Sequence, residues 1–159
     1  VRAYLSDPIT DPDVTTLGLA TPPNSSDQQV LEALAMLVAL RTWASEWLTN
    51  RVRLAVQGDN IAALVLVAKM QTKSDRTGLI ARELALDIAR ATYSPDVVQH
   101  VPGVSNVGAD LLSRRSDPSK KHIPLPSYLD GVQCSKCEAR ARAFWRTLPP
   151  ESASSANMD

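Results

Sequence analysis

Three acidic residues occupy positions at which a carboxylate would be stabilised by a cationic partner. Glu32 falls within an otherwise apolar helical stretch, where an unpaired buried carboxylate would be costly. Asp59 follows a strand-like run, at the carboxyl edge of the predicted sheet, and Asp110 lies in the first turn of the last predicted helix. Carboxylates from these three elements could converge on Mg²⁺, which prefers oxygen ligands. Such a site would suit phosphodiester hydrolysis.

Each of these acids also has a simpler explanation. Glu32 could be a partly exposed helix residue paired with an arginine. Asp59 could be a helix N-cap, and Asp110 could complement the positive end of a helix dipole. Taken one residue at a time, the sequence favours these simpler roles.

Other residues with chemical potential give weaker signals. Cys134 and Cys137 have the spacing of half a zinc knuckle, but no second pair of ligands follows at a suitable distance, so two ordinary thiols are favoured. His122 is isolated in the sequence. Trp43 and Trp47 lie one turn apart on an apolar helix, which favours core packing over base stacking.

Several basic residues could contact phosphates. They are Arg51, Arg53, Arg114, Arg115, Lys120 and Lys121. For those at the end of the last predicted helix, a phosphate contact and a solvated surface explain the charge equally well.

The elements that must position these side chains alternate along the chain. Periodicity predicts strands at 1–5, 15–20, 51–58 and 97–101 and helices at 28–48, 61–70, 77–93 and 105–114. Ser26 and Gln29 have capping-box spacing at the start of the long helix. This order predicts an α/β fold with helices on a mixed sheet.

A change in composition divides the chain near residue 116. From residue 117 the sequence is rich in Pro, Ser and Lys, and we expect a tail over 117–159 with one short helix at about 136–145. Residues 149–159 have the composition of a disordered segment. The sequence therefore predicts one principal domain, residues 1–116, followed by this tail.

Charge and hydropathy limit the functional classes. Of the 159 residues, 17 are Lys or Arg and 17 are Asp or Glu, so net charge neither indicates nor excludes a nucleic-acid partner. No apolar stretch is long enough to span a membrane, and no signal pattern opens the chain. Two closely spaced cysteines favour a reducing compartment. We expect a soluble intracellular protein, cytoplasmic or nuclear, without a membrane partner.

Three segments resemble the ribonuclease H domain of reverse transcriptases from LTR-type or related retrotransposons. They are residues 29–35 around Glu32, residues 57–64 around Asp59, and residues 100–114 around Asp110. The last is the most specific, because a His-x-Pro-Gly turn precedes an Asn, then Ala-Asp, then Leu-Ser-Arg. The likeness covers roughly the first three quarters of the chain, in the family's order.

The resemblance implies a ribonuclease H-like mixed sheet flanked by helices. It implies that Glu32, Asp59 and Asp110 are catalytic metal ligands, the second to fourth members of the family's Asp-Glu-Asp-Asp set, which holds two Mg²⁺ ions, with Mn²⁺ as an alternative. Asn60, Asn106, Arg114 and Arg115 are the implied substrate contacts. The implied reaction is endonucleolytic cleavage of the RNA strand of RNA–DNA hybrids, with an upstream reverse transcriptase domain in the same polypeptide.

The sequence departs from the family's pattern at two points. No strand carrying the first Asp precedes Tyr4, and Asp7, Asp11 and Asp13 lie in a Pro-rich turn. We therefore expect a domain without its first strand that is inactive by itself. The turn before the last helix contains no catalytic His, and His100 is expected to be a structural residue at a strand end.

A noncatalytic, decayed ribonuclease H-like domain that binds nucleic acid or connects other domains is the alternative. A different member of the superfamily, such as an integrase or a structured-DNA nuclease, is disfavoured by the spacing of the Asn106 to Asp110 motif. Integrases of this fold usually end their acidic triad with Glu, whereas the last motif here contains Asp110.

Overall fold

The computed structural model describes residues 2–48, 50, 53–90, 94–115, 117 and 123–149. Within this part of the chain, six α-helices accompany two short pairs of parallel strands. The α/β class predicted from the sequence is therefore confirmed. No helix in these ranges combines the length and apolar character that crossing a membrane would require.

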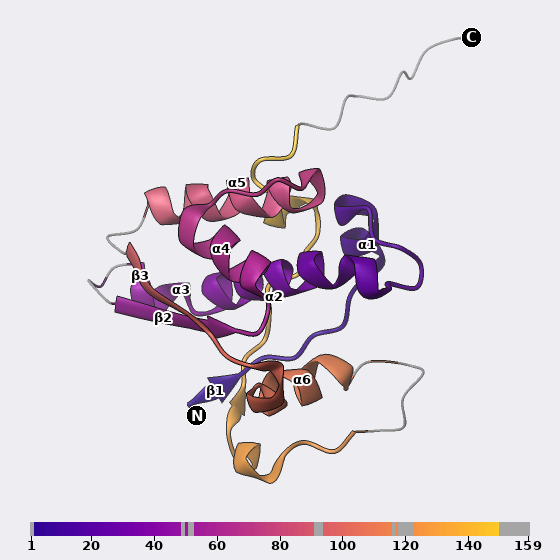
Figure 1. The fold of residues 1–159 in the computed structure, drawn as a ribbon, viewed down its shortest axis with the longest axis vertical. Coiled ribbons are helices and arrows are strands. Elements are labelled where there is room, and N and C mark those ends of the chain that lie inside the picture. The colour runs from indigo at the N-terminus through magenta and orange to yellow at the C-terminus, as the bar shows by residue number, and fades with distance from the viewer. Residues whose placement is uncertain are drawn as a thin grey trace.

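The main strand pair consists of β2 (Arg53–Gly58) and β3 (Ser94–His100), which run parallel with Gly58 opposite His100. Helix α4 (Ile61–Lys69) and helix α5 (Asp75–Ala89) connect them. In Figure 1, α2, α4 and α5 stack on one side of β2 and β3. Ala55 and Gln57 of β2 are exposed on the opposite face, so this face of β2 is open to solvent.

The long helix predicted for 28–48 is interrupted. Helix α2 (Gln28–Thr42) ends at Trp43, and helix α3 (Ala44–Trp47) follows. The expected Ser26–Gln29 cap is also wrong, since Asn24 instead caps a 3-10 turn at Ser25–Asp27. Trp47 is buried and donates from Nε1 to the Leu40 carbonyl at 2.8 Å, which confirms its packing role.

The strand predicted for 15–20 is wrong, because residues Asp11–Leu17 form helix α1. The carboxylate of Asp13 accepts hydrogen bonds from the backbone N–H and the hydroxyl of Thr10, at 2.9 and 2.8 Å. Gly18 ends the helix in the left-handed region, with φ of 59°. These terminal signals outweigh the β propensity of two adjacent threonines.

A second strand pair joins distant parts of the chain. Strand β1 (Ala3–Tyr4) runs parallel to β4 (Gln133–Cys134). Helix α6 (Val107–Arg114) lies near this pair in Figure 1, and the Ser6 hydroxyl donates to the Leu112 carbonyl at 3.1 Å. Helix α6 is thus tied to the segment that follows β1.

Residues 123–149 pack against the rest of the chain. Phe144 and Trp145 belong to the hydrophobic core, with 3% and 1% of their surface exposed. The helix expected at 136–145 is wrong, because the only helical turn there is a 3-10 turn at Arg142–Phe144. Long-range contacts such as that of Arg140 with Asp13 hold this segment in a non-helical path. Disorder was expected for residues 149–159, and residues 150–159 lie outside the described ranges.

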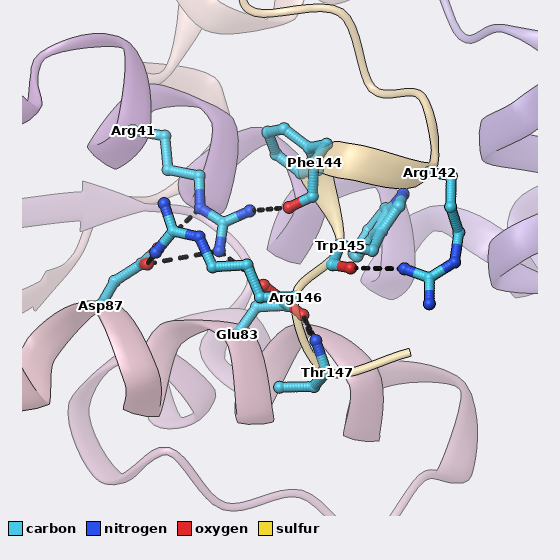
Figure 2. Close-up of polar contacts among 8 residues, drawn as sticks. All are labelled: Arg41, Glu83, Asp87, Arg142, Phe144, Trp145, Arg146 and Thr147. Atoms are coloured by element: carbon cyan, nitrogen blue, oxygen red, sulfur yellow. Dashed lines mark hydrogen bonds and ion pairs between the residues drawn. The ribbon is translucent and has the colours of Figure 1, made fainter. Parts of the chain in front are cut away.

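Ion pairs and hydrogen bonds attach this C-terminal segment to helices α2 and α5 (Figure 2). Arg41 of α2 pairs with Glu83 at 2.6 Å and Asp87 at 2.7 Å, both on α5. Arg41 also donates to the Phe144 carbonyl at 2.5 Å. Thr147 donates to Glu83 from its backbone N–H and its hydroxyl, each at 2.6 Å, and Arg146 pairs with Asp87. We call these six residues the Arg41 cluster.

Burial opposes ionisation of Glu83, but hydrogen bonds from Thr147 and Arg41 outweigh it. Their net effect is to hold the pKa of Glu83 below its ordinary value. The ionised form is therefore the one that the folded protein stabilises.

We expect Arg41→Ala to lower the free energy of unfolding by about 3–5 kcal/mol, because Glu83 and Asp87 lose their shared buried cation. Urea denaturation checks this. The matched control is Arg114→Ala, which breaks an exposed i,i+4 pair with Asp110 and should cost about 0.3–0.5 kcal/mol. Similar losses for both variants would contradict the assigned role of the Arg41 cluster.

Glu83 should also make stability depend on pH. Because its folded pKa is lowered, its contribution is present above the unfolded pKa and is lost as pH falls through the folded value. We expect the unfolding free energy of the wild-type chain to fall more steeply in acid than that of Glu83→Gln. Urea denaturation at a series of acidic pH values measures both slopes, and parallel curves would count against this assignment.

Candidate functional site

The candidate site lies at the carboxyl end of β2. The Val101 N–H donates to the Gly58 carbonyl at 2.8 Å, so strand pairing extends to the last residue of β2. Asn60 caps α4, since its Oδ1 accepts from the Ala63 N–H at 3.1 Å. Asp59 is therefore not the N-cap of α4, and its carboxylate is available for other contacts.

Close packing of α2 on this strand end brings Glu32 toward Asp59. A Cβ added to Gly58 would lie 3.0 Å from the Met36 methyl carbon, so the end of the Met36 side chain packs directly on this residue. Glu32 precedes Met36 by four residues and therefore lies on the same face of α2. The contact of Met36 with Gly58 indicates that Glu32, one turn earlier on α2, lies toward the end of β2.

Glu32 and Asp59 form an electrostatically coupled pair. Burial, and then the negative charge of Asp59, raise the pKa of Glu32. Hydrogen bonds from Gln28, whose Nε2 lies 3.2 Å from Glu32 Oε1, and from Asn60 oppose this rise without cancelling it. Among the described residues neither carboxylate forms an ion pair, so the arginine partner considered for Glu32 is not found there.

The loop before α6 holds Asp59 from the other side. Asn106 Nδ2 donates to Asp59 Oδ1 at 3.1 Å. A Cβ added to Gly103 would lie 3.4 Å from Asp59 Oδ2, so the backbone of this loop closely approaches the carboxylate. Asn106, predicted as a substrate contact, is placed to orient Asp59.

Asp110 lies one helical turn beyond Asn106, and its N–H donates to the Asn106 carbonyl at 3.1 Å. Its side chain is 46% exposed and pairs with Arg114 at 2.8 Å. Within the described ranges, no group of three or more His, Cys, Asp and Glu side chains is arranged to hold a metal ion. The structure brings Glu32 and Asp59 together but leaves Asp110 paired with Arg114.

The other candidates are placed as follows. Arg115 is the C-cap of α6, and His100 ends β3 opposite Gly58. Asp7 and Asp13 both pair with the buried Arg140, so their carboxylates are already engaged. Arg51, Lys120, Lys121 and His122 lie outside the described residues.

Two contributors to the site were missed at the sequence level. Gln28 lies four residues before Glu32, and this i,i+4 spacing was a readable signal for their hydrogen bond. The approach of Gly103 to Asp59 had no such signal, because a loop and a strand end 44 positions earlier meet only in the folded chain.

The arrangement is suited to holding a hard cation. The negative charge of Asp59 acts on Glu32, neither carboxylate is ion-paired among the described residues, and amide groups of Gln28, Asn60 and Asn106 hydrogen-bond to them. Neither the protein-family models nor the curated proteins and solved structures with which the chain was compared match it. The chemistry must therefore be argued from the site itself.

Replacing Asp59 by Asn should lower the pKa of Glu32, because the substitution removes a neighbouring negative charge while keeping the side-chain shape. Carbon-detected NMR titration of the Glu32 carboxyl group measures this shift. Asp110→Asn is the matched control and should move the Glu32 titration less. Equal shifts in the two variants would show that Glu32 does not respond specifically to Asp59.

Proposed function

We propose that this chain is a ribonuclease H-type domain of a retroelement polypeptide, which cleaves the RNA strand of RNA–DNA hybrids during reverse transcription. The coupled pair of Glu32 and Asp59 at the end of β2 is the observation that carries the proposal. The three segments that resemble the family supply the choice of substrate. In this proposal the upstream reverse transcriptase domain belongs to the same polypeptide.

The residues present fit a divalent cation in part. Glu32 and Asp59 offer carboxylate oxygens whose mutual repulsion a cation would relieve. When bound, Mg²⁺ or Mn²⁺ supplies Lewis acidity that activates water and stabilises the leaving oxygen. Asn106 and Asn60 then act as positioning residues, because they hold Asp59 and Glu32 through hydrogen bonds.

Asp110 enters this proposal as an exchangeable ligand. Its pair with Arg114 is exposed, and such pairs contribute about 0–1 kcal/mol. A phosphate group near α6 would compete for Arg114, since guanidinium groups bind phosphate oxygens in a bidentate manner. Arg114 and Arg115 are accordingly proposed as contacts to the nucleic-acid backbone, and Asp110 becomes available once Arg114 has moved.

Cleavage of a labelled RNA–DNA hybrid tests the activity. The chain by itself is expected to be inactive, whereas the polypeptide encoded by the whole parent reading frame should cleave the hybrid with Mg²⁺. Asp59→Asn should lower that rate at least about a hundredfold, because even indirect partners of a metal site are worth about 10- to 100-fold. Asp110→Asn should lower it less, since Asp110 is paired with Arg114. Full activity of Asp59→Asn would rule out this site.

A noncatalytic nucleic-acid-binding or connecting domain is the second candidate. The specific observation in its favour is that Asp110 does not join Glu32 and Asp59 in the described structure. Hybrid binding measured by fluorescence anisotropy distinguishes the two. Binding without cleavage in the longer polypeptide would favour a noncatalytic nucleic-acid-binding domain. Absence of both would exclude the nuclease and leave the connecting domain.

A further inference from the structure

An aromatic side chain of the C-terminal segment packs on helix α6. Tyr128 belongs to a 3-10 turn at Ser127–Leu129, in which the Leu129 side chain is buried. A Cβ added to Gly108, in the first turn of α6, would collide with the Tyr128 hydroxyl oxygen. Only a residue without a Cβ leaves room for this hydroxyl, so Gly108 and Tyr128 fit each other.

The ring of Tyr128 is exposed although its hydroxyl packs against Gly108. Tyr128 is 56% exposed, and Val107 and Val104 are 54% and 87% exposed. Val107 directly precedes Gly108, and Val104 lies in the 3-10 turn Gly103–Ser105 that leads into α6. Exposed apolar side chains that gather in one place mark interaction surfaces, whereas those scattered singly do not. We call Tyr128, Val107 and Val104 the Tyr128 surface.

The other end of α6 carries positive charge. Arg114, whose side chain is 53% exposed, and Arg115 follow Gly108 by six and seven positions. At about 1.5 Å per residue, Gly108 and Arg114 lie about 9 Å apart along the helix axis. A nucleic-acid strand advances about 3.4 Å per nucleotide, so about three nucleotides span this distance. An aromatic and apolar surface followed by guanidinium groups complements a sugar–phosphate backbone.

We propose that the Tyr128 surface binds the sugar–phosphate backbone of an RNA–DNA hybrid. The Tyr128 ring packs against a sugar, and Arg114 pairs with a phosphate about three nucleotides farther along the same strand. The choice of this ligand rests on the proposed function. The C-terminal segment, which contributes Tyr128, thereby takes part in substrate binding.

Fluorescence anisotropy of a labelled RNA–DNA hybrid with the purified chain tests this surface. Tyr128→Ala should weaken binding about fivefold or more, which is the scale of one aromatic contact with nucleic acid. Tyr128→Phe keeps the ring and should bind the hybrid as the wild-type chain does. Leu86→Ala, which removes an exposed apolar side chain from α5, is the matched control and should leave binding unchanged.

Gly108→Ala tests the packing of Tyr128 on α6 independently. Its added methyl group displaces the Tyr128 hydroxyl and should weaken hybrid binding as Tyr128→Ala does. Combining Gly108→Ala with Tyr128→Phe should restore binding, because the added Cβ would then lie 3.5 Å from the ring carbon Cζ, an ordinary contact. A general effect of alanine on α6 would persist in the double variant.

Three outcomes would overturn the proposed surface: unchanged binding by Tyr128→Ala, no rescue in the double variant, or no hybrid binding by the wild-type chain. Tighter binding of a single strand than of the hybrid would assign the surface to unpaired nucleic acid instead. Cleavage by the longer polypeptide is measured separately, so cleavage together with unchanged binding by Tyr128→Ala would reject this surface and leave the nuclease. Far-ultraviolet circular dichroism of every variant verifies that it is folded.

Discussion

The buried guanidinium of Arg41 is the contact on which the arrangement of the chain depends. It joins the last turn of α2 to Glu83 and Asp87 of α5 and to the Phe144 carbonyl in the C-terminal segment. Desolvation of three charges offsets much of their attraction, so such a cluster chiefly fixes which groups meet. Since Glu32 lies at the other end of the same helix, the register that Arg41 imposes on α2 also sets the position of the candidate site.

The candidate site has the opposite electrostatic character. At the Arg41 cluster each carboxylate is paired with an arginine, whereas among the described residues neither Glu32 nor Asp59 forms an ion pair, and burial and the charge of Asp59 raise the pKa of Glu32. The side-chain amides of Gln28, Asn60 and Asn106 donate hydrogen bonds to the two carboxylates. Because these donors are uncharged, they orient the carboxylates without neutralising their charge. This contrast with the Arg41 cluster is the electrostatic feature on which the proposed cation site rests.

The parts of the fold and of the candidate site that could be predicted from the sequence are those encoded by local patterns. Hydrophobic periodicity located β2, α4, α5 and α6 closely. The same patterns singled out Glu32 within a helix, Asp59 at a strand end and Asp110 in a first helical turn, of which the structure brings Glu32 and Asp59 together. The strand expected at 15–20 failed because Thr10 and Gly18 define a helix. The helix expected at 136–145 failed because Arg140 bonds to Asp13, 127 positions earlier, and no local pattern carries that contact.

Buried and exposed ion pairs differ in how easily they are exchanged, and this difference decides whether Asp110 could become a metal ligand. The side chains of Arg41 and Arg140 are 7% and 4% exposed, and each makes several bonds that hold it in place. Arg114 is 53% exposed, so its pair with Asp110 can be given up at small cost when another anion approaches. In the proposed ribonuclease, Asp110 would therefore join Glu32 and Asp59 only when Arg114 binds another anion. Under the proposed function, a nucleic-acid backbone lying along α6 would be that competing anion, so the proposal links the availability of Asp110 to substrate binding.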